Sequence, residues 1–198
     1  MWRWRRNISA PARNDPAFPC DYFSKSGRTY LIYENYRQDM SEKLEPVDIR
    51  ILEALQRDGR LTNQALSAQV GLSASPCWRR VRQLEDEGVI RDYTATLDRR
   101  RIGLGVLAFI RVRIDSHSEA EAEAFSEEVA KLEEVVACYS IAGDSDFLLQ
   151  VVSPNLDTYA DFAMTVIRRL PRIKEMQTTF VLKEIKPFRG FPLDFASG

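Results

Sequence analysis

The chain has 198 residues, of which 44% are hydrophobic and 29% charged, a balance typical of folded globular domains. This length is sufficient for one large or two small domains, because most domains hold about 100–150 residues. The net charge is only −1, and no stretch approaches the roughly 18 apolar residues that a membrane-spanning helix needs. These values exclude a chain that is disordered throughout, and they argue against a transmembrane protein and against one that coats DNA through bulk charge.

The few cysteine and histidine residues argue against a disulfide-rich secreted protein and against a metal-binding protein. Cys20, Cys77 and Cys138 are too few and too scattered for a disulfide framework, and no apolar segment follows the basic N-terminus as in a secretory signal. We therefore expect a cytoplasmic protein. His117 is the one histidine and no C-x-x-C pair is present, so we expect no metal site and no cofactor.

Residues 1–40 are expected to form a weakly structured extension. They are rich in Trp and Arg at the start, are interrupted by three prolines, and have strand character only at Thr29–Tyr33. Met40 precedes a polar lead and a strong helical pattern, so it is an alternative start of the protein. The functional alternative for this segment is a basic arm that contacts DNA phosphates.

Three short helices are predicted in residues 41–98. Helical start and stop residues mark their ends: Pro46 begins the first, Thr62 and Gly71 bound the second, and Ser73 and Gly88 bound the third. The connection between the second and third helices is a tight turn. This spacing is typical of a helix-turn-helix, and a strand or short ribbon expected at Val89–Leu97 would make it a winged form.

The third helix carries the candidate DNA-binding residues. With Cys77, Val81 and Leu84 on the inner face of a helical wheel, Arg79, Arg82 and Gln83 point outward. Arginine pairs with guanine and glutamine with adenine in the major groove, and a helix N-terminus binds phosphate. The predicted contacts are Ser73, Ser75, Trp78, Arg79, Arg82 and Gln83. The alternatives are a merely solvated face for the arginines and packing against the wing for Trp78.

A different pattern follows the basic hinge at 99–103. Period-two and helical patterns alternate in the order strand, helix, strand, then strand, helix, strand. The predicted elements are Leu104–Ile114, Glu119–Leu132, Val135–Ala142, Phe147–Val152, Asp157–Leu170 and Met176–Ile185. We expect a ferredoxin-like βαββαβ domain, with both helices on one face of a four-stranded antiparallel sheet, and an α+β chain overall.

The other face of this sheet would remain uncovered. Leu107 and Phe109 lie on it, and large apolar residues on a wet face indicate an interface, so we expect a homodimer or a higher homo-oligomer. Alternatively, the C-terminal tail folds back over the sheet with its aromatic residues Phe188, Phe191 and Phe195.

Two motifs carry a resemblance to a known family. Asp48–Leu97, with the runs Gly71–Cys77 (Gly-Leu-Ser-Ala-Ser-Pro-Cys) and Arg80–Glu85 (Arg-Val-Arg-Gln-Leu-Glu), resembles the DNA-binding half of the Lrp/AsnC regulators of prokaryotes. Gly143–Leu149 (Gly-Asp-Ser-Asp-Phe-Leu-Leu) is similar to the turn of their amino-acid-sensing half. The resemblance covers about residues 42–187. It implies a transcription factor, with double-stranded DNA at a pseudo-palindromic site and an amino-acid effector as partners, and it leaves the effector's identity open.

The turn is also chemically suited to an amino acid. Backbone N–H groups can meet the ligand's carboxylate, and an aspartate can meet its ammonium. The candidate effector residues are Gly143, Asp144, Ser145 and Asp146, to which the resemblance adds Tyr139, Ser140, Thr178 and Thr179. An ordinary hairpin turn is the alternative, since Gly and Asp are common turn residues.

We expect five segments: an extension at 1–40, the helix-turn-helix domain at 41–98, a hinge at 99–103, the ferredoxin-like effector and oligomerisation domain at 104–186, and a tail at 187–198. The sequence shows no catalytic cluster, so we do not expect an enzyme. The rival hypothesis is a ferredoxin-like small-molecule-binding module whose helical domain mediates protein contacts and has no DNA role.

Overall fold

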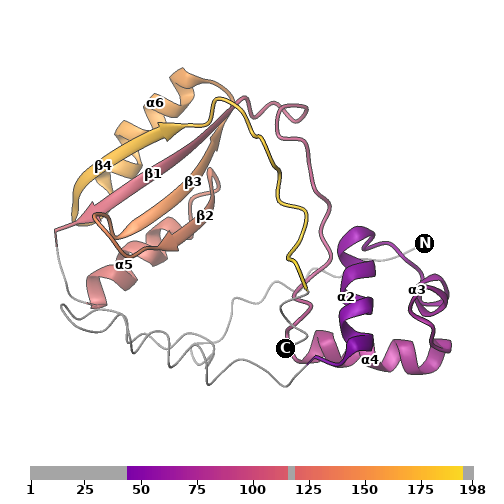
Figure 1. Ribbon diagram of the computed structural model, residues 1–198. Coiled ribbons are helices and arrows are strands. Elements are labelled where there is room, and N and C mark those ends of the chain that lie inside the picture. The colour runs from indigo at the N-terminus through magenta and orange to yellow at the C-terminus, as the bar shows by residue number, and fades with distance from the viewer. Residues whose placement is uncertain (1–43, 116–118, 194–198) are drawn as a thin grey trace. The chain divides into compact units, whose positions relative to one another are not determined.

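The computed structural model describes residues 44–115 and 119–193 of the chain. These residues form two compact units (Figure 1): one joins 44–103 with the tail 182–193, and the other spans 104–181. Expectations on residues 1–40, including the Met40 start, and on His117 and Phe195 lie outside the described residues. None of the helices in the described ranges is long and apolar enough to cross a bilayer.

The first unit is built on three helices, α2 (Pro46–Arg57), α3 (Asn63–Val70) and α4 (Ala74–Asp86). The predicted boundary signals act as expected at α3: the Thr62 hydroxyl accepts a hydrogen bond from the Ala65 N–H at 3.1 Å, and Gly71 ends the helix in the left-handed conformation. Their shared core consists of Ile51, Leu52, Leu66, Val70, Cys77 and Leu84. Burial raises the pKa of the Cys77 thiol, which is therefore a packing residue.

The strand predicted at Val89–Leu97 is wrong: this segment runs without regular secondary structure. A strand is defined by its ladder, and these residues have no strand paired to them in the described ranges. Three of their large side chains, those of Val89, Tyr93 and Leu97, are exposed. The sequence of this segment therefore predicted a strand that has no pairing partner in the described ranges.

The C-terminal tail packs on the helical unit, which contradicts the alternative that it covers the sheet. The Phe191 N–H donates to Gln56 Oε1 of α2 at 2.6 Å, and Gln56 Nε2 donates to the Phe191 carbonyl at 3.1 Å. Leu193 packs against the core of the helical unit. The Gln56 side-chain amide thus both accepts a hydrogen bond from the backbone of Phe191 and donates one to it.

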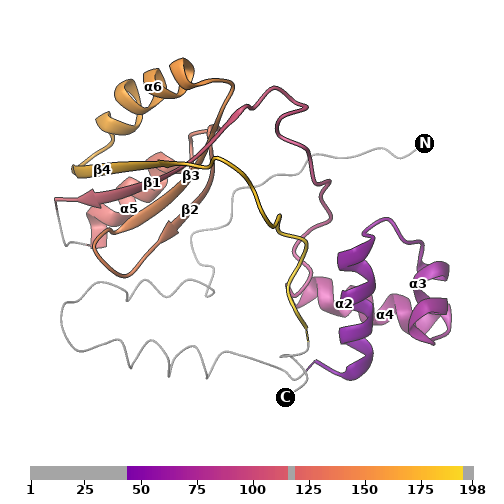
Figure 2. The ribbon, with the colours of Figure 1, turned by 45° about the horizontal axis from the view of Figure 1, so that its top comes forward.

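The second unit is an antiparallel sheet with two helices on one face, as predicted. Its elements are β1 (Val106–Ile114), α5 (Glu119–Val129), β2 (Val135–Ser140), β3 (Phe147–Ser153), α6 (Leu156–Thr165), a 3-10 turn η1 (Ile167–Arg169) and β4 (Ile173–Phe180). The strand order is β2-β3-β1-β4, and the second view shows α6 lying over one face (Figure 2). The fold class expected from the sequence is confirmed.

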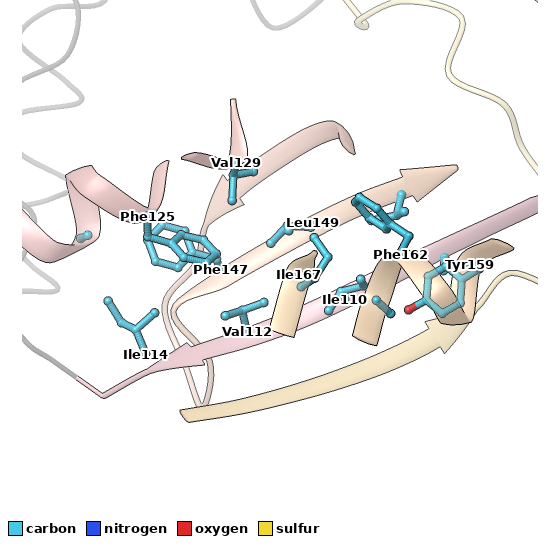
Figure 3. Close-up of a cluster of buried hydrophobic side chains, with 14 residues drawn as sticks. Ile110, Val112, Ile114, Phe125, Val129, Phe147, Leu149, Tyr159, Phe162 and Ile167 are labelled. Atoms are coloured by element: carbon cyan, nitrogen blue, oxygen red, sulfur yellow. The ribbon is translucent and has the colours of Figure 1, made fainter. Parts of the chain in front are cut away.

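The core of this unit lies between the sheet and its helices. Ile110, Val112 and Leu149 point from the sheet toward Phe125 of α5 and Phe162 of α6, and all are buried (Figure 3). The alternation predicted along the first strand is therefore confirmed. The last strand begins three residues earlier and ends five residues earlier than predicted: its pairing with β1 starts at Ile173, opposite Ile114 beyond a bulge, and stops at Phe180, opposite Ala108.

The opposite face of the sheet differs in part from expectation. Phe109, with its neighbours Gln150 and Thr179 in the adjacent strands, lies on this face and is half-buried. Leu107 lies on the same face but is already buried within one chain. Leu107 therefore offers less free apolar surface than its position in the sequence indicates.

Candidate functional sites

The outer face of α4 presents most of the predicted DNA-binding residues. Cys77 and Leu84 face the core, and the exposed side chains are those of Trp78, Arg79, Arg82 and Gln83. The inner and outer faces predicted for this helix are therefore confirmed. Arg79 has no ion pair or side-chain hydrogen bond within the described parts of the chain. Its guanidinium is thus available for an external anion or base.

The start of α4 is open to solvent. Ser73 is the N-cap residue by its extended backbone, but its hydroxyl makes no capping hydrogen bond, and Ser75 is likewise exposed. The N-terminal end of a helix carries partial positive charge and favours phosphate. Both serines are therefore solvent-accessible at the end of α4 that favours an anion.

Arg80 has a structural role that the sequence did not reveal. Its Nη1 donates to both carboxylate oxygens of Asp48, at 3.1 and 3.0 Å, and its Nη2 pairs with Glu45. These hydrogen bonds, that to Glu45 first, raise the pKa of the Arg80 guanidinium. Asp48 is buried and also accepts the Glu45 N–H. Arg80 thus fastens α4 to the start of α2, and only the fold brings these acids within reach.

Arg82 is held by its own helix. Its Cζ lies 5.8 Å from the centroid of the Trp78 ring, and its Nη1 donates to Glu85 at 3.2 Å. Gln83 donates to Glu87 one turn further on at 2.7 Å. The three outward side chains therefore differ: Arg79 is unpaired within the described residues, whereas Arg82 and Gln83 each donate a hydrogen bond to a glutamate.

The turn before β3 has two aspartates with different surroundings. Asp146 Oδ2 accepts the Ile114 N–H at 2.8 Å, and the Asp146 N–H donates to the Val112 carbonyl at 2.9 Å. Asp144 is exposed and carries no ion pair or hydrogen bond within the described residues. Gly143 has a φ of 139°, which L side chains rarely adopt. Asp146 thus braces the turn onto β1, and Asp144 is the free carboxylate.

The other effector candidates lie on two faces of the sheet. In β2, Tyr139 lies opposite Leu148 on the face without helices, whereas Ser140 lies opposite the buried Phe147. In β4, Thr179 lies opposite Phe109 on the face without helices, whereas Thr178 lies opposite the buried Ile110 on the helix side. The Thr178 hydroxyl is 2.6 Å from that of Tyr159 on α6. Tyr139 and Thr179 thus share the uncovered face, and Ser140 and Thr178 are on the helix side.

Potential metal ligands do not gather in the described ranges. No group of three His, Cys, Asp or Glu side chains there could hold an ion. The candidate sites are therefore built from arginine, aspartate and backbone groups.

Comparison with known proteins identifies the family. A family model described as a winged helix-turn-helix DNA-binding domain matches residues 44–91, and the Lrp/AsnC ligand binding domain matches residues 107–191. The chain is 38% identical over 144 residues to a leucine-responsive regulatory protein of Rhizobium meliloti, covering 73% of this chain and 92% of that one. The chain belongs to the Lrp/AsnC family. The leucine-responsive regulatory protein of Escherichia coli K12 is 37% identical over 143 residues, or 72% of this chain and 87% of that one.

Solved structures of transcriptional regulators are similar to about three quarters of this chain. A transcriptional regulator from Neisseria meningitidis, in complex with L-Met, superposes with a TM-score of 0.73 at 41% identity, covering 77% of this chain and 98% of that one. An AsnC family regulator from Agrobacterium tumefaciens gives 0.72 at 38% identity, with 76% and 98% covered. This Lrp/AsnC chain is therefore a DNA-binding transcriptional regulator with a ligand-binding domain.

Proposed function

We propose that this regulator binds a pseudo-palindromic DNA site as a homo-oligomer, with α4 as the recognition helix in the major groove. The observation that carries the proposal is that two neighbouring arginines of α4 have different surroundings. Arg80 faces inward and fastens the helix to α2, while Arg79 is unpaired on the outer face. A fixed helix with free guanidinium donors is the arrangement that reads guanine edges.

The remaining α4 residues have complementary roles. Arg82 and Gln83 contact bases further along the groove, Trp78 packs beside Arg82, and Ser73 and Ser75 bind a phosphate at the helix start. Two such helices in a dimer would stand about one DNA turn, roughly 34 Å, apart. The protein would act in the cytoplasm, where a prokaryotic chromosome lies.

The effector is an amino acid bound at the turn around Gly143. A zwitterion needs a counter-charge for its ammonium and donors for its carboxylate. Asp144 is the carboxylate left free to meet the ammonium, and the L-Met complex of the Neisseria regulator supports this ligand class. Ser145 and Asp146 shape the turn, and Tyr139, Ser140, Thr178 and Thr179 are outer candidates. Binding would shift the assembly or the DNA affinity.

The test of the DNA role is the binding of Arg79→Ala to the DNA upstream of the protein's own gene. We expect specific binding to weaken by about 1–3 kcal/mol if a bidentate base contact is lost, with oligomer size unchanged. Arg57→Ala is the matched control, because Arg57 is an exposed arginine of the same unit on α2. Equal affinity of Arg79→Ala and wild type at fixed salt would contradict the assignment of α4.

A further inference from the structure

A hydrogen-bonded chain runs from the segment after α4 back to the recognition helix. The Tyr93 hydroxyl donates to Glu85 Oε1 at 3.0 Å, and Glu85 Oε2 accepts from Arg82 Nη1 at 3.2 Å. Arg82 in turn lies over the Trp78 ring. Tyr93 thus donates to one oxygen of the Glu85 carboxylate and Arg82 to the other.

Tyr93 is itself held in place. Its ring lies beside Gly59, just beyond the end of α2, because a Cβ built on Gly59 would lie 3.6 Å from Tyr93 Cδ1. Tyr93 is 44% exposed, and partial burial of its ring, followed by the hydrogen bond and charge of Glu85, raises the pKa of Tyr93 to about 12. The phenol therefore stays protonated near neutral pH and remains the donor to the Glu85 carboxylate.

We infer that Glu85 and Tyr93 are positioning residues that hold Arg82 in the orientation in which it reads DNA. This inference rests on the proposed function of α4. Arginine has five N–H donors, and the Glu85 pair uses one of them. The Arg82 side chain is still 56% exposed, so the remaining donors are open to a base. Glu85 therefore orients Arg82 without blocking it.

The physical gain is a smaller ordering cost on binding. Immobilising a long, flexible side chain in an interface costs about 0.5–1.5 kcal/mol, equivalent to roughly a two- to tenfold change in affinity. A side chain already held by a carboxylate on one side and an indole on the other has lost part of that freedom before DNA arrives. Arg79, which has no such support, would not share this advantage.

Tyr93→Phe is the sharpest variant, because it removes one hydroxyl and leaves every charge in place. We expect it to weaken binding to the specific site about two- to fivefold while leaving the affinity for random DNA and the salt dependence unchanged. Tyr159→Phe is the matched control, since it also removes one hydrogen-bonded phenol hydroxyl, that to Thr178 in the other unit. We expect no loss of DNA specificity from this control.

A double-mutant cycle separates positioning from general structural support. In an Arg82→Ala background, Tyr93→Phe should have no further effect on specific binding, because the side chain that it positions is gone. If the two losses add, or if Tyr93→Phe weakens specific and random binding equally, the inference is overturned. Should Tyr93→Phe fail to fold, the same cycle with Glu85→Gln decides, with the specific-to-random affinity ratio as its readout.

The cycle also distinguishes this inference from the proposed function. If Arg82→Ala weakens specific binding and Tyr93→Phe does not, the positioning role is wrong and the recognition-helix assignment stands. If Arg82→Ala binds the specific site as well as wild type does, then Arg82 does not read DNA. The proposed role of that arginine and the positioning of it are then both overturned.

Discussion

At the scale of single residues, two aspartates of the same turn have different structural roles. Asp144 and Asp146 are two positions apart in one turn, yet one is exposed and the other accepts a backbone N–H of β1. Sequence alone predicted that either aspartate could meet a ligand or brace the turn. The hydrogen bond to Ile114 distinguishes them, and it depends on strand register, which no local pattern specifies.

This difference predicts opposite consequences for two matched substitutions. Asp146→Ala would leave the buried Ile114 N–H without its acceptor, so we expect the free energy of unfolding to fall by about 1–3 kcal/mol. Asp144→Ala should change it by less than about 0.5 kcal/mol, because this side chain is exposed. Thermal or denaturant unfolding measures both.

The same pair tests the effector site. In calorimetry against the twenty amino acids, Asp144→Ala should bind the wild-type effector more than tenfold more weakly, because a charge-assisted hydrogen bond contributes roughly 1.5–3 kcal/mol. DNA binding without effector should persist, since α4 belongs to the other unit. An unchanged affinity in Asp144→Ala, or no binding of any amino acid to wild type, would remove the turn from consideration.

At the scale of elements, local chemistry predicted the helix ends well and long-range pairing poorly. Thr62 and Gly71 cap α3 through contacts with residues close to them in sequence, so their roles could be predicted from the sequence. The missing strand at Val89–Leu97, the early start of β4 and the docking of the tail all depend on residues far away in the chain. Gln56 and Phe191, for example, are 135 positions apart.

The docked tail makes a prediction about Gly190. Its φ is 117°, and a Cβ there would clash with Gln56 Oε1 and lie 2.8 Å from Gln56 Cδ, so Gly190→Ala should displace the Gln56 side chain and release the tail from α2. We expect trypsin to cut after Arg189 several times faster in this variant, because local unfolding exposes the bond. Mass spectrometry of a digestion time course measures the rate.

A control separates the clash from backbone strain. Gly103 also has a positive φ, of 88°, but a Cβ there would meet nothing within 4 Å. Gly103→Ala should therefore leave cleavage after Arg189 at the wild-type rate. If both variants are cut equally fast, or neither faster than wild type, the Gln56 pairing does not retain the tail.

At the scale of the whole molecule, we expect copies of the chain to associate through the sheet face opposite the helices. Large apolar side chains there, Phe109 and Leu148 among them, are only half-buried in a single chain. Since Leu107 is already buried, the available apolar surface is centred on Phe109 rather than on the start of β1. A face of this kind is typical of an interface between proteins.

We therefore expect Phe109→Glu to dissociate the assembly. A carboxylate placed at the centre of an apolar interface must be desolvated on association, which opposes binding far more strongly than the loss of one contact. Sedimentation velocity at micromolar concentration should show wild type at least dimeric and Phe109→Glu monomeric. Met164→Glu is the control, because Met164 is exposed on α6, on the helix side of the sheet. An oligomer that survives Phe109→Glu but not Met164→Glu would place the interface on the helix layer instead.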